Sequence, residues 1–116
     1  MTIWNQALAN DTWLIGVSGR LDQNQTPDLE AEFNTLLEAG HNRIIVDLSE
    51  VHYINSGGLR CLVTAWRKAR KQGGNVLLTG LRARVQEVFS MVGFDKVFDV
   101  YPNRQVALEV WQAQEQ

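Results

Sequence analysis

Residues 43–66 read RIIVDLSEVHYINSGGLRCLVTAW, and two kinds of hydrophobic pattern meet within them. The first six residues are a short β-branched run bounded by polar residues, which predicts a strand covered on both faces, as in parallel sheets. Beyond a loop, apolar residues recur at i, i+3, i+4 and i+7, which predicts a helix with one buried side. These residues are Leu59, Leu62, Val63 and Trp66. A buried strand followed by a helix is the repeating unit of parallel α/β folds.

The residues before this unit predict a β-hairpin and a first helix. Strands are expected near 3–8 and over 12–18, joined by a turn at Asn10-Asp11, with Gly19 ending the second strand. In that strand an alternating pattern predicts one buried face. After a polar loop, Thr26 and Pro27 predict a helix start, with Thr as N-cap and Pro at the first helical position. The alternating strand residues are Trp13, Ile15 and Val17, and the apolar helix residues are Leu29, Phe33, Leu36 and Leu37.

The residues after this unit continue the alternation. Gly73-Gly74 ends the second helix, strands are expected over 75–79 and 97–100, and helices over 85–92 and from Pro102 onward. The order predicts an α/β fold with a mixed, mostly parallel sheet of about five strands, about four helices and an N-terminal β-hairpin. A length of 116 residues fits a single domain over residues 1–116.

Composition narrows the class of function. The net charge of −2 argues against a nucleic-acid binder, which would carry a basic excess. The chain begins without a signal-peptide pattern, and its apolar runs are too short for a membrane span, so we expect a cytoplasmic protein. Cys61 is the single cysteine, which excludes an intrachain disulfide and predicts a packed side chain rather than a reactive thiol. Neither histidine has metal-ligand spacing around it, so no metal or cofactor is expected.

The loop 49–58 carries the strongest functional signal. It follows a buried strand, and in open α/β sheets the working surface lies at the carboxyl ends of the strands. Ser56 stands beside the start of the next helix, and the two glycines after it remove side chains, which would let another macromolecule approach the hydroxyl. Alternatively, Ser56 or Asn55 only caps the helix. A nucleotide cradle is a third possibility, but no lysine follows at P-loop spacing.

The same stretch resembles the signature of anti-sigma factor antagonists, the STAS family, in which a strand ending in D-L-S precedes I-D-S-S-G-L or I-D-S-T-G-L. The matching residues here are 47–49 and 54–59, and 19–22 and 85–101 are also similar to the family. The resemblance implies the STAS fold and makes Ser56 the phosphoacceptor. Asn55 replaces the usual Asp, and Gly57 replaces the second Ser or Thr, which leaves Ser56 as the only hydroxyl in the motif.

The resemblance also implies the partners. These are an anti-sigma factor serine kinase of the histidine-kinase-like ATPase fold, whose binding frees a sigma factor, and a PP2C-type phosphatase that removes the phosphate. Such a protein is not an enzyme, has no catalytic residues, and would be a monomer or weak dimer without direct nucleic-acid or membrane contacts. The alternative is a scaffold or accessory STAS subunit without a phosphorylation cycle, as in stressosome-like or transport-associated assemblies. A small enzyme is a third hypothesis.

Two further residues are expected near Ser56. Loops after neighbouring parallel strands share one sheet edge, so Asp22 is predicted to shape the partner surface, or else to cap its own loop. Arg60 lies one turn beyond Ser56 and is predicted to join the interface, or else to be a solvated helix cation. The predicted partner-binding residues are therefore Asp22, Asn55, Ser56, Gly57, Gly58 and Arg60.

Overall fold

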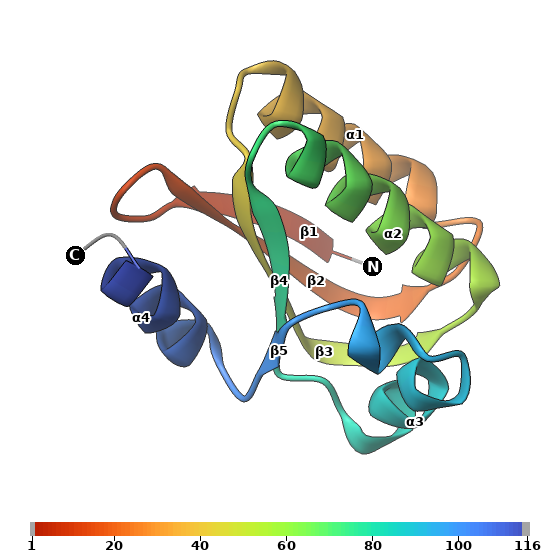
Figure 1. Cartoon of the computed structure of the whole chain (residues 1–116). Helices are drawn as coiled ribbons and strands as arrows, with labels where there is room; N and C mark the ends of the chain where they lie inside the picture. Colours follow the sequence, from red (N-terminus) through yellow and green to blue (C-terminus); the bar gives the residue numbers. More distant parts are fainter. Residues whose placement is uncertain (1, 115–116) are drawn as a thin grey trace.

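A computed structural model describes residues 2–114 and confirms the predicted α/β fold (Figure 1). Five strands form one sheet in chain order, with β1 antiparallel to β2 and the other neighbours parallel. The strands are β1 (Thr2–Ala7), β2 (Thr12–Leu21), β3 (Arg43–Ile54), β4 (Asn75–Thr79) and β5 (Val100–Tyr101). The α-helices within the described residues are α1 (Thr26–Glu38), α2 (Ser56–Lys71), α3 (Ala83–Met91) and α4 (Arg104–Gln114).

The predicted N-terminal hairpin is confirmed, and the conformation of its turn explains why Asn10 and Asp11 occupy it. Asn10 and Asp11 both adopt positive φ, 60° and 54°. A two-residue turn with positive φ at both positions matches the twist of antiparallel strands, and Asn and Asp tolerate that conformation better than most residues. The turn brings Ala7 opposite Trp13 and sets the register of β1 on β2.

The sheet is covered on both faces. α1, α2 and α3 pack on one face, where Ile15 and Val46 belong to the larger core cluster, and α4 covers the other. Leu14 is fully buried under α4 with Ile45 and Leu77. The expectation that the strand over 12–18 buries one face is therefore wrong. The helix that covers the second face comes from the far end of the chain, so alternation within the strand does not report it.

The strands that lead to the predicted site are longer than expected. β2 continues through Gly19 to Leu21, and β3 continues through much of the predicted loop to Ile54. Their pairing shifts register twice in this extension, and Gly19 has a φ of 100°, which a glycine adopts readily within a bulge. Leu21 then pairs with Ile54. The two strands thus end side by side, so the loops that follow them lie at the same edge of the sheet.

The start of α1 and the last strand also differ from the sequence-based expectation. Gln25, not Thr26, is the N-cap of α1. Thr26 is the first helical residue, so Pro27 is the second rather than the first as predicted. The last strand is Val100–Tyr101 rather than 97–100, because a short 3-10 helix, η1 (Phe94–Lys96), precedes it. Neither difference moves the residues at the start of α2.

Candidate partner-binding site

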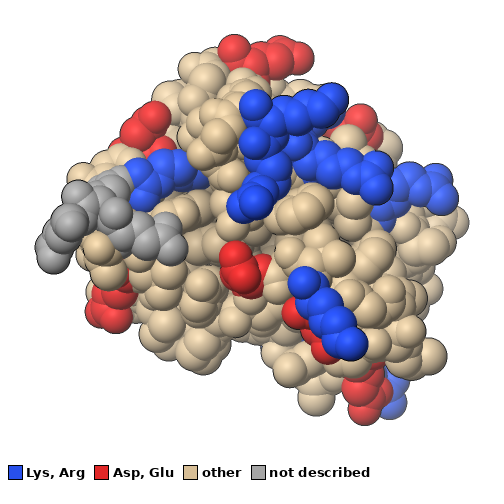
Figure 2. All heavy atoms as spheres, in the orientation of Figure 1, with Lys and Arg blue, Asp and Glu red and all other residues tan. Residues whose placement is uncertain are grey.

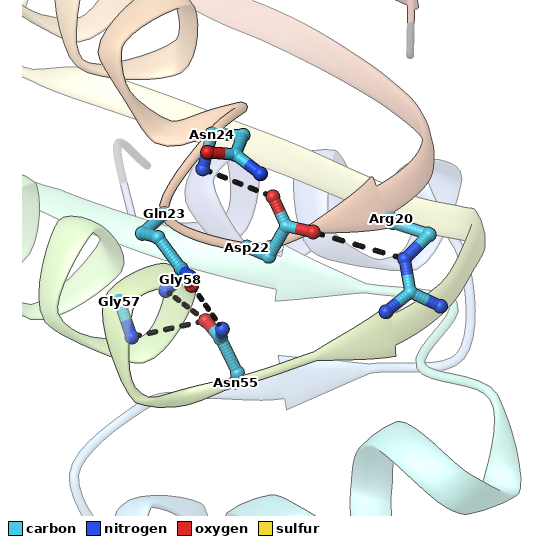
Figure 3. Close-up of polar contacts among 7 residues, drawn as sticks. All are labelled: Arg20, Asp22, Gln23, Asn24, Asn55, Gly57 and Gly58. Carbon is cyan, nitrogen blue, oxygen red and sulfur yellow. Dashed lines mark hydrogen bonds and ion pairs between the residues drawn. The ribbon is translucent and has the colours of Figure 1, made fainter.

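Asn55 caps the start of α2. Its backbone is extended, with φ −119° and ψ −173°, and its side-chain Oδ1 accepts hydrogen bonds from the backbone N–H groups of Gly57 (3.0 Å) and Gly58 (3.2 Å). Its Nδ2 donates to Oε1 of Gln23 at 2.6 Å (Figure 3). These bonds satisfy N–H groups that have no partner within the helix. Of the two candidate caps, Asn55 is therefore the one used.

Ser56 is the first residue of α2, and its side chain is exposed. Among the described residues, its hydroxyl makes no hydrogen bond, because the capping is done by Asn55. The hydroxyl therefore has no structural task that a chemical modification would disturb. It lies where the dipole of a helix start favours a negative group.

The two positions after Ser56 are occupied by glycine for different physical reasons. Gly58 is buried, and a Cβ there would lie 2.5 Å from the backbone oxygen of Leu21 and 2.8 Å from a side-chain carbon of Ile54. Its lack of a side chain therefore lets α2 pack on the strand ends, which corrects the interpretation that both glycines clear the surface for a partner. At half-buried Gly57 a Cβ would lie 3.3 Å from Asn55 and Gln23 side-chain atoms, a tight but tolerable contact.

Asp22 caps its own loop. Its Oδ1 accepts a hydrogen bond from the backbone N–H of Asn24 at 3.0 Å, and its Oδ2 lies 3.7 Å from Nε of Arg20 (Figure 3). These contacts match the alternative in which Asp22 caps its own loop rather than shaping a partner surface. The expected contact between the two loops exists, but Gln23 makes it, through Asn55. The sequence analysis missed Gln23. The sequence feature that could have indicated Gln23 is its side-chain amide, which lies at the same sheet edge as Asn55 and can hydrogen-bond to the Asn55 amide.

The end of β3 carries an aromatic side chain beside this edge. The guanidinium of Arg20 lies 4.0 Å from the ring centroid of Tyr53, whose side chain is 39% exposed. A groove of about 460 Å³ lies between this strand end and α3, and Ser56 is not among its lining residues. Arg60 is exposed in α2. The neighbourhood of Ser56 is therefore an open surface, which suits a macromolecular partner better than a small ligand.

Cys61 lies inside the helix layer, as predicted. The residue is 8% exposed, and its Sγ lies 4.0 Å from the backbone oxygen of Thr26 at the start of α1. Burial, with a smaller contribution from the charge of Glu30, raises the pKa of the thiol to about 12. The thiol therefore stays protonated at neutral pH and is a poor nucleophile.

Within residues 2–114, no group of three or more His, Cys, Asp or Glu side chains is placed to hold a metal ion. Over the same residues, none of the helices combines the length and apolar character that crossing a bilayer requires.

The sheet order, the helices and the exposed serine at the Asn55-capped start of α2 are those of a STAS-type regulatory domain. The STAS domain family model matches residues 7–107, and the chain belongs to this family. The candidate anti-sigma factor antagonist BtrV of Bordetella bronchiseptica is 32% identical over 91 residues, 78% of each chain. The anti-sigma-B factor antagonist of Bacillus subtilis is 28% identical over 86 residues, 74% of this chain and 78% of that one. Proteins of this class are regulators rather than enzymes.

Solved structures show the same fold. A crystal structure of a candidate anti-sigma factor antagonist from Thermotoga maritima superposes with a TM-score of 0.87 at 22% identity, covering 92% of both chains. The Bacillus protein SpoIIAA matches in its unphosphorylated form with a TM-score of 0.77, covering 96% of this chain and 98% of that one. Its phosphorylated form matches with 0.75, covering 94% and 99%. Both SpoIIAA matches are 17% identical.

Proposed function

We propose that this chain is an anti-sigma factor antagonist that binds an anti-sigma serine kinase through the surface around Ser56, and that phosphorylation of Ser56 ends the binding. The observation that carries the proposal is the exposed Ser56 hydroxyl, without a hydrogen bond among the described residues, at the first position of a helix already capped by Asn55. A PP2C-type phosphatase would restore the binding form.

The start of α2 suits a phosphate. Asn55 caps the helix through its own side chain, so phosphorylation of the neighbouring hydroxyl leaves the cap intact. No acidic residue lies in the first turn of α2 to repel a phosphate. The dipole of a helix start also favours a negative group. SpoIIAA, whose fold this chain shares, has been solved in both phosphorylated and unphosphorylated forms, which supports a fold that accepts the group.

The consequence of phosphorylation would fall on the partner. A phosphate adds about 1.5 to 2 negative charges at neutral pH. A protein packed over Ser56 would have to bury that charge without a partner, at a cost of several kcal/mol. A difference of about 3 kcal/mol already lowers affinity by roughly a hundredfold. The switch therefore needs no rearrangement inside this domain.

The test is phosphorylation in vitro. The chain is incubated with the anti-sigma kinase from the same genome and ATP, and the phosphate is mapped by mass spectrometry. We expect one phosphate, on Ser56, its loss in Ser56→Ala, and its retention in the matched variant Thr26→Ala at the start of α1. We also expect Ser56→Asp to bind the kinase more weakly. Phosphate on another residue, or unchanged binding by Ser56→Asp, would contradict the proposal.

A further inference from the structure

The charges of this chain are separated between α2 and the rest of the fold. α2 contains no acidic residue and five cations, although the whole chain has only 11 Lys and Arg against 13 Asp and Glu. All thirteen acids therefore lie outside α2, with only six cations among them. In Figure 2, most of the basic side chains lie over the upper part of the face on which Figure 1 places α2, and a few lie lower. The five cations of α2 are Arg60, Arg67, Lys68, Arg70 and Lys71.

Three of these cations share one side of the helix with Ser56. Relative to Ser56, Arg60 is at i+4, Arg67 at i+11 and Lys71 at i+15, which are spacings that return to the same face of an α-helix. All four side chains are exposed. We name this row of Ser56, Arg60, Arg67 and Lys71 the α2 strip. It runs about 22 Å along the helix at 1.5 Å per residue.

Within the part of the chain that the structure describes, the cations of the α2 strip form no ion pair with an acid. Among residues 2–114, the basic side chains that contact a carboxylate are Arg20, Arg82 and, as a hydrogen bond, His41, and none of them belongs to α2. The helix dipole explains cations in the last turn, which includes Lys71. It does not explain Arg60, which lies near the positive end of the helix, or Arg67.

We infer that the α2 strip is a docking surface for an acidic surface of a protein partner. The inference rests on the function proposed above, since it describes the charge of the partner that covers Ser56. An open row of unneutralised cations on an otherwise acidic protein attracts an acidic partner surface and orients it along the helix. The chain has a net charge of −2 and lacks the basic excess of nucleic-acid binders, which favours an acidic protein surface over nucleic acid.

The α2 strip gives phosphorylation a second effect. A phosphate on Ser56 places negative charge at one end of the strip, one helical turn from Arg60. It would repel an acidic partner and would also compensate the nearest cation. At physiological ionic strength charges interact over about 8 Å, so this effect reaches Arg60 and leaves Lys71 largely unchanged. Phosphorylation would then weaken docking most at the Ser56 end.

A direct test uses the full chain, labelled with nitrogen-15, and a poly-glutamate peptide as the probe. We expect the peptide to shift the backbone amide signals of α2, and we expect the affinity to fall as ionic strength rises from about 0.01 M to about 0.15 M, because the screening length shortens from about 30 Å to about 8 Å. Parallel titrations use duplex DNA and vesicles containing phosphatidylserine. Tighter binding of DNA or vesicles than of the peptide, or shifts outside α2, would overturn the inference.

Charge reversal supplies the matched control. Arg67→Glu with Lys71→Glu should weaken peptide binding roughly tenfold, since exposed charge pairs contribute about 0.2 to 1 kcal/mol each and reversal turns attraction into repulsion. Lys96→Glu with Arg104→Glu changes the net charge equally but lies on η1 and α4, so it should have much less effect. Equal losses in the two double variants would show that only net charge matters and would contradict a specific strip.

The same variants separate this inference from the proposed function. With the purified anti-sigma kinase, Arg67→Glu with Lys71→Glu should weaken binding roughly tenfold while Ser56 is still phosphorylated at saturating kinase. If the kinase binds the wild-type chain and the double variant equally, the acidic-partner inference fails and the proposed function stands. If the kinase does not bind the wild-type chain, the proposed function fails, and the peptide titration still decides the inference.

Discussion

The starts of α1 and α2 occupy equivalent places and are built in different ways. Each helix follows a parallel strand, and those strands, β2 and β3, end side by side. α1 begins at Thr26, and its N-cap residue Gln25 makes no side-chain cap hydrogen bond. The first turn contains Pro27 and the acid Asp28. α2 begins with Asn55 as a two-bond cap and has no acid in its first turn.

This difference separates a structural helix start from one that can receive an anion. At α1 the chain's own carboxylate already compensates the positive end of the dipole. At α2 the N–H groups are capped by a neutral amide, so the charge of the dipole is left uncompensated beside an exposed serine. Of these two helix starts, only that of α2 is therefore suited to receive an anion.

The largest expected effect concerns the thiol packed between the two helix starts. Burial raises the pKa of Cys61 from its ordinary value of 9.0 to about 12, so at pH 8 the thiolate fraction should be about a thousandfold lower than in the unfolded chain. We expect a thiol reagent such as DTNB to label the native protein very slowly and the urea-unfolded protein quickly. Because the folded-state pKa is raised, this group's stabilising contribution is complete below about pH 9 and is lost as pH rises further. Rapid labelling of native protein would mean that the two helix starts separate readily.

The next effect concerns the glycines of α2. Gly58→Ala should lower the free energy of unfolding by about 1 to 3 kcal/mol, because the new Cβ meets the backbone of Leu21, which cannot move aside cheaply. Gly57→Ala is the matched control and should change stability little, since its tight contacts offset the better helix propensity of alanine. Urea denaturation measures both. Equal effects would refute the distinction between the two glycines.

Removing the caps should give a smaller difference. Asn55→Ala should cost about 1 kcal/mol of unfolding free energy, because two N–H groups lose their acceptor. Gln25→Ala at the start of α1 should stay within about 0.5 kcal/mol, because Gln25 makes no side-chain cap. Thermal unfolding of the two variants provides the comparison. A larger loss in Gln25→Ala would reverse the roles assigned to the two helix starts.

The smallest effect tests the charge difference itself. Ser56→Asp should stabilise the protein by about 0.3 to 1 kcal/mol at low ionic strength, because the new carboxylate meets an uncompensated helix start. Thr26→Asp should gain less, since Asp28 already lies in the first turn of α1 and would repel it. The gain in Ser56→Asp should shrink with added salt. A greater gain from Thr26→Asp would contradict an anion-ready α2.

Much of the fold was readable from local pattern. The β-branched run that starts β3, the turn at Asn10-Asp11 and the apolar spacing of the helices each report a preference that the structure keeps. The covering of Leu14 by α4 was not readable, because it depends on a contact between distant parts of the chain. The extension of β3 was also missed, since exposed polar residues such as His52 in a strand look like those of a loop.

The residues at the centre of the site, Ser56 and Asn55, could be predicted from the sequence, but the contacts that position them could not. Ser56 and Asn55 stand out because serine, asparagine and two glycines at a strand-to-helix junction are unusual together. The role of Gly58 required the position of Leu21, and the role of Gln23 required the side-by-side ends of β2 and β3. These contacts join residues more than thirty positions apart, so no local spacing reveals them.

Isothermal titration calorimetry tests the proposed switch at Ser56 most directly. It compares the affinity of the purified anti-sigma kinase for the unphosphorylated chain with its affinity for the chain that carries phosphate on Ser56. We expect the phosphate to weaken binding by roughly a hundredfold or more, because a bound kinase would have to bury a charge of about −1.5 to −2 at the interface. Equal affinity of the two forms would contradict the central claim that the start of α2 is the switch.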